Sequence, residues 1–342
     1  MLAQFLVRGC AALITLWASC APAATAPFNP SPHAIDIPAW FKPSFLDFGE
    51  EIADAAKRGK RVLVYFGQDG CPYCRELMRA NFGQKDIADK TRRHFDAIAV
   101  NIWGDTEVKW LDRKTYTEKS LAALLKVQFT PTLLFLDEKG QVVLRLNGYY
   151  PPHQFSVALD YVAGRHEART SFPQYLAANA REQASGVLHD EPFFVKRPYD
   201  LARSPQPRKP LAVLFEQKEC AACDQLHREG FKTPSVRTRL GALEVVRLEL
   251  FGREPVVTRT GEKLTEGEWA RRLGVAYVPT IVFFDAAGRE VFRVEGYLRP
   301  FHLESSFEYV TSGSYRNEPS FQRYVQQRAE KIRRAGGKVQ LW

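Results

Sequence analysis

The chain has 342 residues, of which 45% are hydrophobic and 25% are charged, a length and composition that suit two globular domains. Its formal net charge is +9, but Lys and Arg are spread along the chain without a long basic run or a nucleic-acid-binding motif. We therefore expect no nucleic acid among its partners, and only a general attraction to acidic proteins or anionic membrane surfaces.

Residues 1–23 have the pattern of a secretory signal peptide. Arg8 precedes a short apolar run, AALITLW, and small residues follow, with Ala21 and Ala23 at the positions that a signal peptidase reads. We expect cleavage after this segment and a periplasmic location. The alternative is a lipid anchor at Cys20, but Trp17 stands where such signals usually hold Leu.

Six cysteines are present, and Cys10 and Cys20 lie in or beside that signal segment. The remaining four form two C-x-x-C pairs: Cys71 with Cys74, and Cys220 with Cys223. A disulfide that spans two residues closes almost no loop, so it stabilises a fold poorly. The pairs are therefore interpreted as redox or metal sites rather than structural cross-links.

The elements of the first half are expected in the following order. An amphipathic helix at 44–60 precedes a buried strand at 61–68, and the first cysteine pair follows. After it come a helix within 75–95, a strand at 95–103, a helix that opens at Thr117 and a strand that begins at Pro131. A further strand and a helix within 148–162 complete this half.

The second half repeats this order roughly 150 residues later. RVLVYFGQ before the first pair matches PLAVLFEQ before the second, and TEKSLAALL matches TEGEWARRL. We place the first domain at 36–166, a helical linker at 167–209 and the second domain at 210–342. SFPQYLAANAREQASG and SFQRYVQQRAEKIRRAGG are similar, so each repeat is expected to own a helical tail, with the last one packed on its own domain.

A proline recurs just before the strands TLLFLD and TIVFFD. Pro131 and Pro279 cannot donate to a sheet, so the middle of a central strand is excluded for both. Their recurrence predicts a special turn with a cis peptide bond, and the alternative is a trans proline at the first residue of each strand.

These features resemble the thioredoxin fold, and more narrowly the SoxW-type periplasmic thioredoxins of bacterial sulfur oxidation. The resemblance rests on YFGQDGCPYC, NIWGD, FTPTLLFLD and GYYPPHQF. It implies an α/β protein with two thioredoxin-like domains, each a mixed central sheet flanked by helices. Two features depart from the family: Tyr65 and Leu214 stand where thioredoxins commonly carry a buried Asp, and the second motif, Cys-Ala-Ala-Cys, lacks a proline.

The cysteines are the candidate catalytic residues. A cysteine at the first turn of a helix faces unpaired N–H groups that stabilise its thiolate, the nucleophile of disulfide exchange. Cys71 and Cys220 are expected to attack the substrate disulfide, and Cys74 and Cys223 to resolve the mixed disulfide. The residues expected at the substrate surface are Thr130, Pro131, Val278, Pro279, Pro72 and Tyr73.

Four residues near these motifs are open to more than one interpretation. Tyr73 either adds bulk beside the site or merely packs at the surface. His227 follows Cys223 by one helical turn and suggests a metal ligand, but no fourth ligand is visible, so we expect no metal and a partly exposed helix histidine. Trp103 and Asp105 of NIWGD are candidates for shaping a substrate groove, although a Trp in such a place is more often part of the core or its rim.

The resemblance implies a thiol–disulfide oxidoreductase without a cofactor that reduces disulfides of periplasmic proteins, with a membrane thiol carrier as electron donor. Two alternatives stay open. In one, the second domain is a partner-binding or chaperone-like module and only Cys71 and Cys74 react. In the other, the protein is a disulfide isomerase, although it offers no dimerisation domain of the kind isomerases often carry.

Overall fold

The structure is a computed structural model that describes residues 34–180, 184–203 and 208–339. Ala34–Trp342 form one compact unit. The expected signal peptide at 1–23, with Cys10 and Cys20, lies outside the described residues. Among the described residues, no helix is both long and apolar enough to cross a bilayer.

The first repeat is a four-stranded sheet in the order β2-β1-β5-β6, with β1 parallel to β2 and antiparallel to β5, and β5 antiparallel to β6. A small antiparallel hairpin, β3–β4, accompanies it. The elements are α1 (Phe48–Lys57), β1 (Arg61–Gly67), α2 (Pro72–Glu76), the π-helical turn η1 (Leu77–Asn81), α3 (Lys85–His94), β2 (Phe95–Asn101), β3 (Glu107–Lys109), β4 (Thr115–Thr117), α4 (Glu118–Leu124), β5 (Thr132–Leu136), β6 (Val142–Asn147) and α5 (Pro152–Ala163).

The second repeat has the same topology, with the order β13-β12-β8-β9 and β8 parallel to β9. Its elements are β8 (Leu211–Glu216), α7 (Ala221–Gln225), the π-helical turn η4 (Leu226–Gly230), α8 (Pro234–Leu240), β9 (Glu244–Glu249), β10 (Pro255–Val257), β11 (Lys263–Thr265), α9 (Glu266–Arg272), β12 (Thr280–Phe284), β13 (Glu290–Glu295) and α10 (Pro300–Thr311). The 3-10 turn η5 (Ser314–Arg316) and α11 (Phe321–Arg334) follow.

The described parts of the segment between the repeats, 167–180, 184–203 and 208–209, contain helices and a strand. This segment holds the 3-10 turn η2 (His166–Ala168), α6 (Phe172–Asn179), β7 (Tyr199–Asp200) and the 3-10 turn η3 (Leu201–Arg203). β7 joins β10 and β11 in a three-stranded sheet, so the end of this segment is part of the second repeat. The expected tail helices are confirmed as α6 and α11. The domain limits drawn from the sequence stay predictions.

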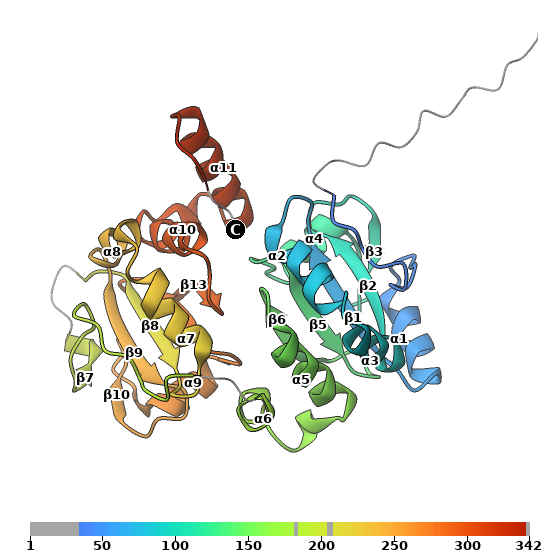
Figure 1. The fold of residues 1–342 in the computed structure, drawn as a ribbon, viewed down its shortest axis with the longest axis horizontal. Helices are drawn as coiled ribbons and strands as arrows, with labels where there is room; N and C mark the ends of the chain where they lie inside the picture. The colour runs from blue at the N-terminus through green and yellow to red at the C-terminus, as the bar shows by residue number, and fades with distance from the viewer. Residues whose placement is uncertain (1–33, 181–183, 204–207, 340–342) are drawn as a thin grey trace, which may run out of the picture. The chain divides into compact units, whose positions relative to one another are not determined.

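The alternation of side chains along β1 explains the layers of the first repeat. Every residue of β1 is buried, and successive side chains point to opposite faces. Leu63 and Tyr65 join a core with residues of α2, η1, α3 and α5, whereas Val62 and Val64 join a core with residues of α1 and α4. Helices therefore cover both faces of the sheet, as Figure 1 shows. The expected fold class is confirmed.

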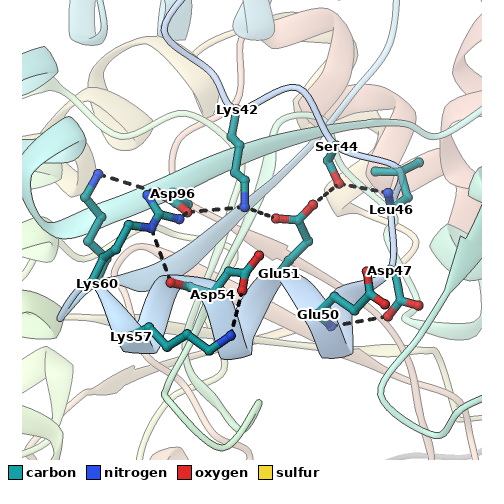
Figure 2. A network of polar contacts seen from close by, with 11 residues as sticks. Lys42, Ser44, Leu46, Asp47, Glu50, Glu51, Asp54, Lys57, Lys60 and Asp96 are labelled. Carbon is teal, nitrogen blue, oxygen red and sulfur yellow. Dashed lines mark hydrogen bonds and ion pairs between the residues drawn. The ribbon is translucent and has the colours of Figure 1, made fainter.

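An ion network fixes the segment that leads into α1 (Figure 2). The carboxylate of Glu51 accepts from Lys42 and from the Ser44 hydroxyl, and the latter lies 2.7 Å away. The Lys42 ammonium also lies 3.6 Å from Asp96 at the start of β2, whose side chain is 5% exposed. Asp96 is further paired with Lys60 at 3.4 Å. These contacts hold the chain before α1 against β2.

A close backbone approach explains a glycine that recurs in both repeats. A Cβ at Gly104 would lie 1.8 Å from a carboxylate oxygen of buried Glu118, and Gly252 stands in the same relation to Glu266. Glu118 accepts the N–H of Asn101 at 2.8 Å at the end of β2. A side chain at either glycine would displace this buried carboxylate. The hairpins β3–β4 and β10–β11 that flank it are three residues per strand, and the sequence pattern did not predict them.

Candidate active site

Both cysteine pairs lie where a strand turns into a helix. Cys71 is the N-cap of α2 and Cys220 is the N-cap of α7. In each case the N-cap Sγ accepts the backbone N–H of the second cysteine, Cys74 or Cys223, at 3.0 Å. The placement at a helix N-terminus is therefore as expected. The N–H that stabilises a thiolate is already directed at the sulfur.

Each pair forms a disulfide in this structure, with Cα–Cα distances of 5.3 Å and 5.2 Å. All four cysteines are buried, and the N-cap sulfurs belong to the more exposed member of each pair: Cys71 is 4% exposed and Cys74 is fully buried. In the first repeat, Cys71 is therefore the less deeply buried of the two cysteines. Cys220 at 3% and Cys223 at 2% differ less.

The recurring prolines are cis, as predicted, and the trans alternative is wrong. Both Thr130–Pro131 and Val278–Pro279 have cis peptide bonds. The carbonyl oxygen of Thr130 lies 3.3 Å from the Sγ of Cys71, so the residue before the proline lies in contact with the cysteine expected to be the nucleophile. In the reduced, protonated form the S–H of Cys71 can donate a hydrogen bond to this carbonyl oxygen.

A glutamine that the sequence analysis missed organises the first site. The side-chain amide of Gln68 donates to the Thr130 hydroxyl at 3.1 Å and accepts from the indole N–H of Trp103. The same position in the second repeat is Gln217, within the matched strings YFGQ and LFEQ. Its recurrence was the signal that could have identified it. Trp103 thus lies at the site, whereas Asp105 is 74% exposed and pairs with Lys119.

Tyr73, between the two cysteines, is partly buried at the rim of the first site. Its hydroxyl accepts the backbone N–H of Arg299 at 3.1 Å, and its ring lies 5.4 Å from that of His302, edge to face. Burial raises the pKa of Tyr73 to about 12, against a smaller lowering by the Arg299 N–H. Tyr73 therefore stays a neutral phenol, and it contacts the second repeat rather than open solvent.

The two sites differ in the side chains of the strand that precedes each cysteine pair. In the first repeat, the Tyr65 ring fills the space beside Gly67, where an added Cβ would lie 1.9 Å from the Tyr65 hydroxyl. Burial raises the pKa of Tyr65, with a smaller contribution from Asp69. In the second repeat the matching residues are Leu214 and Glu216, and the shorter leucine leaves room for the carboxylate.

Glu216 belongs to a buried charge cluster that the sequence analysis missed. His227 is 3% exposed; its Nε2 lies 3.0 Å from Glu216 and its Nδ1 lies 3.1 Å from Glu191. The expectation of a partly exposed histidine is therefore wrong. Its ring also stacks on that of His189, which is paired with Asp224 at 2.6 Å. Glu191 and His189 come from the inter-repeat segment, so sequence spacing gave no signal for them.

The surroundings of His227 favour its protonated form. Burial alone would lower the pKa of His227, but hydrogen bonds and charge from Glu216 and then Glu191 more than offset it and raise the pKa. Both ring nitrogens already face carboxylates. Within the described residues, no group of three or more His, Cys, Asp or Glu side chains has an arrangement that could hold a metal ion.

Comparison with known proteins identifies the family. A sequence profile of the thioredoxin-like domain matches residues 48–163 and 198–311, more than half of the chain. The chain belongs to the thioredoxin-like family. It carries two such domains, each with a C-x-x-C pair in the arrangement of a thiol–disulfide oxidoreductase.

Individual relatives match about one repeat. Human nucleoredoxin is 28% identical over 131 residues, which are 35% of this chain and 29% of nucleoredoxin. A thioredoxin-fold protein from Helicobacter pylori is 28% identical, with a TM-score of 0.31, over 35% of this chain and 79% of that one. A Thermus thermophilus thioredoxin is 25% identical, with a TM-score of 0.27, over 34% and 83%.

Proposed function

We propose that this protein is a periplasmic thiol–disulfide oxidoreductase that reduces disulfides in other exported proteins. The observation that carries the proposal occurs twice. An N-cap cysteine sulfur accepts the N–H of its partner cysteine at 3.0 Å, next to a cis proline. Membership in the thioredoxin-like family supports the reaction class, and the pattern of residues 1–23 is the basis for the location.

The reaction begins with both cysteines of a pair reduced. The Cys71 thiolate attacks one sulfur of the substrate disulfide, whose S–S bond breaks, and the departing substrate thiolate takes a proton. Cys74 then loses its proton and attacks the Sγ of Cys71, which releases the second substrate thiol. The pair ends as the disulfide seen here, and the substrate has gained two electrons and two protons. A membrane thiol carrier restores the dithiol.

Cys220 and Cys223 perform the same steps in the second repeat. The matched sequences YFGQDGCPYC, NIWGD and FTPTLLFLD are the basis for extending the proposal to a role of the SoxW type, linked to sulfur oxidation. Nucleoredoxin and the other relatives are matched over single repeats, so their partners are not carried over.

The test is turnover on a protein disulfide. The full chain, with dithiothreitol as donor, should accelerate the reduction of insulin, measured as turbidity. The double variant Cys71→Ser/Cys220→Ser should lose at least about 100-fold of this acceleration, because no attacking thiolate remains. Each single variant should retain part of it. Full acceleration in the double variant would contradict the proposal. If Cys71→Ser abolishes the acceleration and Cys220→Ser leaves it unchanged, only the first cysteine pair is active.

A further inference from the structure

The two tail helices lie against the cysteine sites of the opposite repeats. α6 follows the first repeat and α11 follows the second, and their opening residues, Phe172 and Phe321, are buried in the cores of their own repeats. The residue after each phenylalanine, Pro173 or Gln322, contacts the site of the other repeat. The sequence predicts a last helix packed on its own domain, as Phe321 is, but gives no sign of the reciprocal contact.

At the first site the side chain of Gln322 makes two hydrogen bonds. Its oxygen accepts from Gln68 at 2.7 Å, and its nitrogen donates to the backbone oxygen of Gln128 at 3.1 Å. Gln68 is also the partner of the Thr130 hydroxyl, and Gln128 lies two residues before Thr130. The amide of Gln322 therefore occupies the backbone acceptor of Gln128, in the segment that leads into the cis proline.

Further contacts extend this coverage along the same edge. The side-chain oxygen of Gln128 accepts the N–H of Phe321 at 3.1 Å. The ring of Phe129 lies 5.3 Å from that of Phe321, and the guanidinium of Arg323 lies 5.4 Å from the Trp103 ring centroid. α11 thus contacts Gln128 and Phe129, the two residues before Thr130, as well as Trp103, and a substrate chain would have to replace these contacts.

The second site has the matching arrangement. Cys220 and Val278 line a cavity of about 30 Å³ together with Pro173 and Leu176 of α6. A cavity of this size leaves little room beside Cys220 while α6 stays in place. Tyr277, the residue before Val278, donates to Gln154 of α5 at 2.6 Å.

We propose that α11 is an intramolecular cover of the first cysteine site, and that a partner reaches Cys71 only by displacing the Gln322 contacts. The inference rests on the proposed function and names its substrate class. A disulfide carried on an extended, flexible segment can take over the backbone acceptor of Gln128. A disulfide within a rigid folded surface cannot follow the path beneath α11, so the first site selects against it.

The cover is held at the site by contacts weak enough to exchange. A hydrogen bond between neutral groups contributes little net free energy, because water or another chain can replace it, and a substrate backbone can supply an equivalent donor to Gln128. The rest of α11 is anchored to α10, where Arg328 pairs with Glu304 at 2.6 Å and Glu308 at 2.9 Å. The opening turn can therefore yield while the helix stays attached to its own repeat.

The test compares a small and a bulky alkylating reagent on the reduced full-length protein. Iodoacetamide and a maleimide on a polyethylene glycol chain would be reacted separately, and Cys71 and Cys220 would be followed as separate peptides by mass spectrometry. The variant Gln322→Ala/Arg323→Ala removes the polar contacts of the cover and leaves Phe321 and Val325 in place. Arg333→Ala, on the exposed last turn of the same helix, is the matched control.

In the double variant, the bulky reagent should react with Cys71 about tenfold faster relative to iodoacetamide, and the ratio at Cys220 should change less than about twofold. The ratio of the two reaction rates reports steric access to the sulfur, because a change in the acidity of the thiol alters the rates of both reagents alike. Gln68→Ala, which removes a partner from the other side, should shift it in the same direction. An unchanged ratio in folded variants would overturn the cover. Alkylation does not depend on turnover. If the ratio shifts as predicted but the protein fails to reduce insulin, the proposed function is refuted and the cover is not.

Discussion

The two cysteine sites share a backbone and differ in the side chains beneath it. In both, the N-cap sulfur lies 3.0 Å from the N–H of the second cysteine and a cis proline follows. Beneath the first site lies the neutral phenol of Tyr65, whereas beside the helix of the second lie Glu216 and His227. Short sequence motifs are thus sufficient to produce the same backbone arrangement twice. The buried polar residues around each cysteine pair make the two sites chemically different.

The largest expected loss of stability comes from a substitution that breaks the charge cluster at the second site. His227→Met introduces the residue that the first repeat holds at the matching position, Met78, and leaves Glu191 and Glu216 buried without their shared partner. It should cost about 3–5 kcal/mol, because an uncompensated buried charge remains. The measurement is the urea unfolding transition of the full chain.

Met78→Leu is the matched control in the first repeat, where it should cost less than about 1.5 kcal/mol because it conserves volume. Equal losses in the two variants would show that His227 serves only as packing.

The pH dependence of stability sharpens the same contrast. The pKa of His227 is raised in the folded protein, so its stabilisation is fully present below the unfolded value of about 6.5 and is lost as the pH rises through the folded pKa. The unfolding midpoint of the wild type should therefore fall with rising pH above about 6.5, relative to Glu216→Gln. Parallel pH profiles for the two proteins would contradict the assignment.

How much of this the sequence could predict depends on the range of the contacts. The N-cap cysteines, the cis prolines and the cap of α4 at Thr117 arise from neighbours within a few residues, and their patterns predicted them. The pairing of His227 with Glu191 joins residues 36 positions apart. The contact of Gln68 with Gln322 spans 254. Hydrophobic periodicity and motif spacing carry no information on contacts of this range. The charge cluster at His227 and the cover formed by α11 could therefore be found only in the structure.

A smaller effect is expected at Tyr73, which the second repeat replaces with Ala222. Tyr73→Phe removes the hydroxyl that accepts the Arg299 N–H and should cost about 1 kcal/mol. Thermal unfolding of the full chain would show it as a lowered midpoint. Tyr149→Phe, a partly buried tyrosine of the same repeat, is a control for the change of residue type. A larger loss at Tyr149 would show that the Arg299 contact contributes little.

The smallest effect is expected at Asp105, whose side chain is 74% exposed and pairs with Lys119. Asp105→Ala should change stability by less than about 1 kcal/mol and insulin reduction by less than about twofold. Trp103→Phe, which removes the indole donor to Gln68, should lower insulin reduction more. The reverse order would place the substrate contact of NIWGD at Asp105.

The most direct test of the account is the reduction potential of each pair, measured separately. Cys220→Ser/Cys223→Ser isolates the first pair and Cys71→Ser/Cys74→Ser isolates the second. Each variant would be equilibrated against defined thiol–disulfide buffers, and its thiols counted by alkylation and mass. We predict that both pairs form reversible disulfides at reducing potentials, and the difference between them gives the direction of electron flow. A second pair that never cycles would contradict the account and leave Cys71 and Cys74 as the one working site.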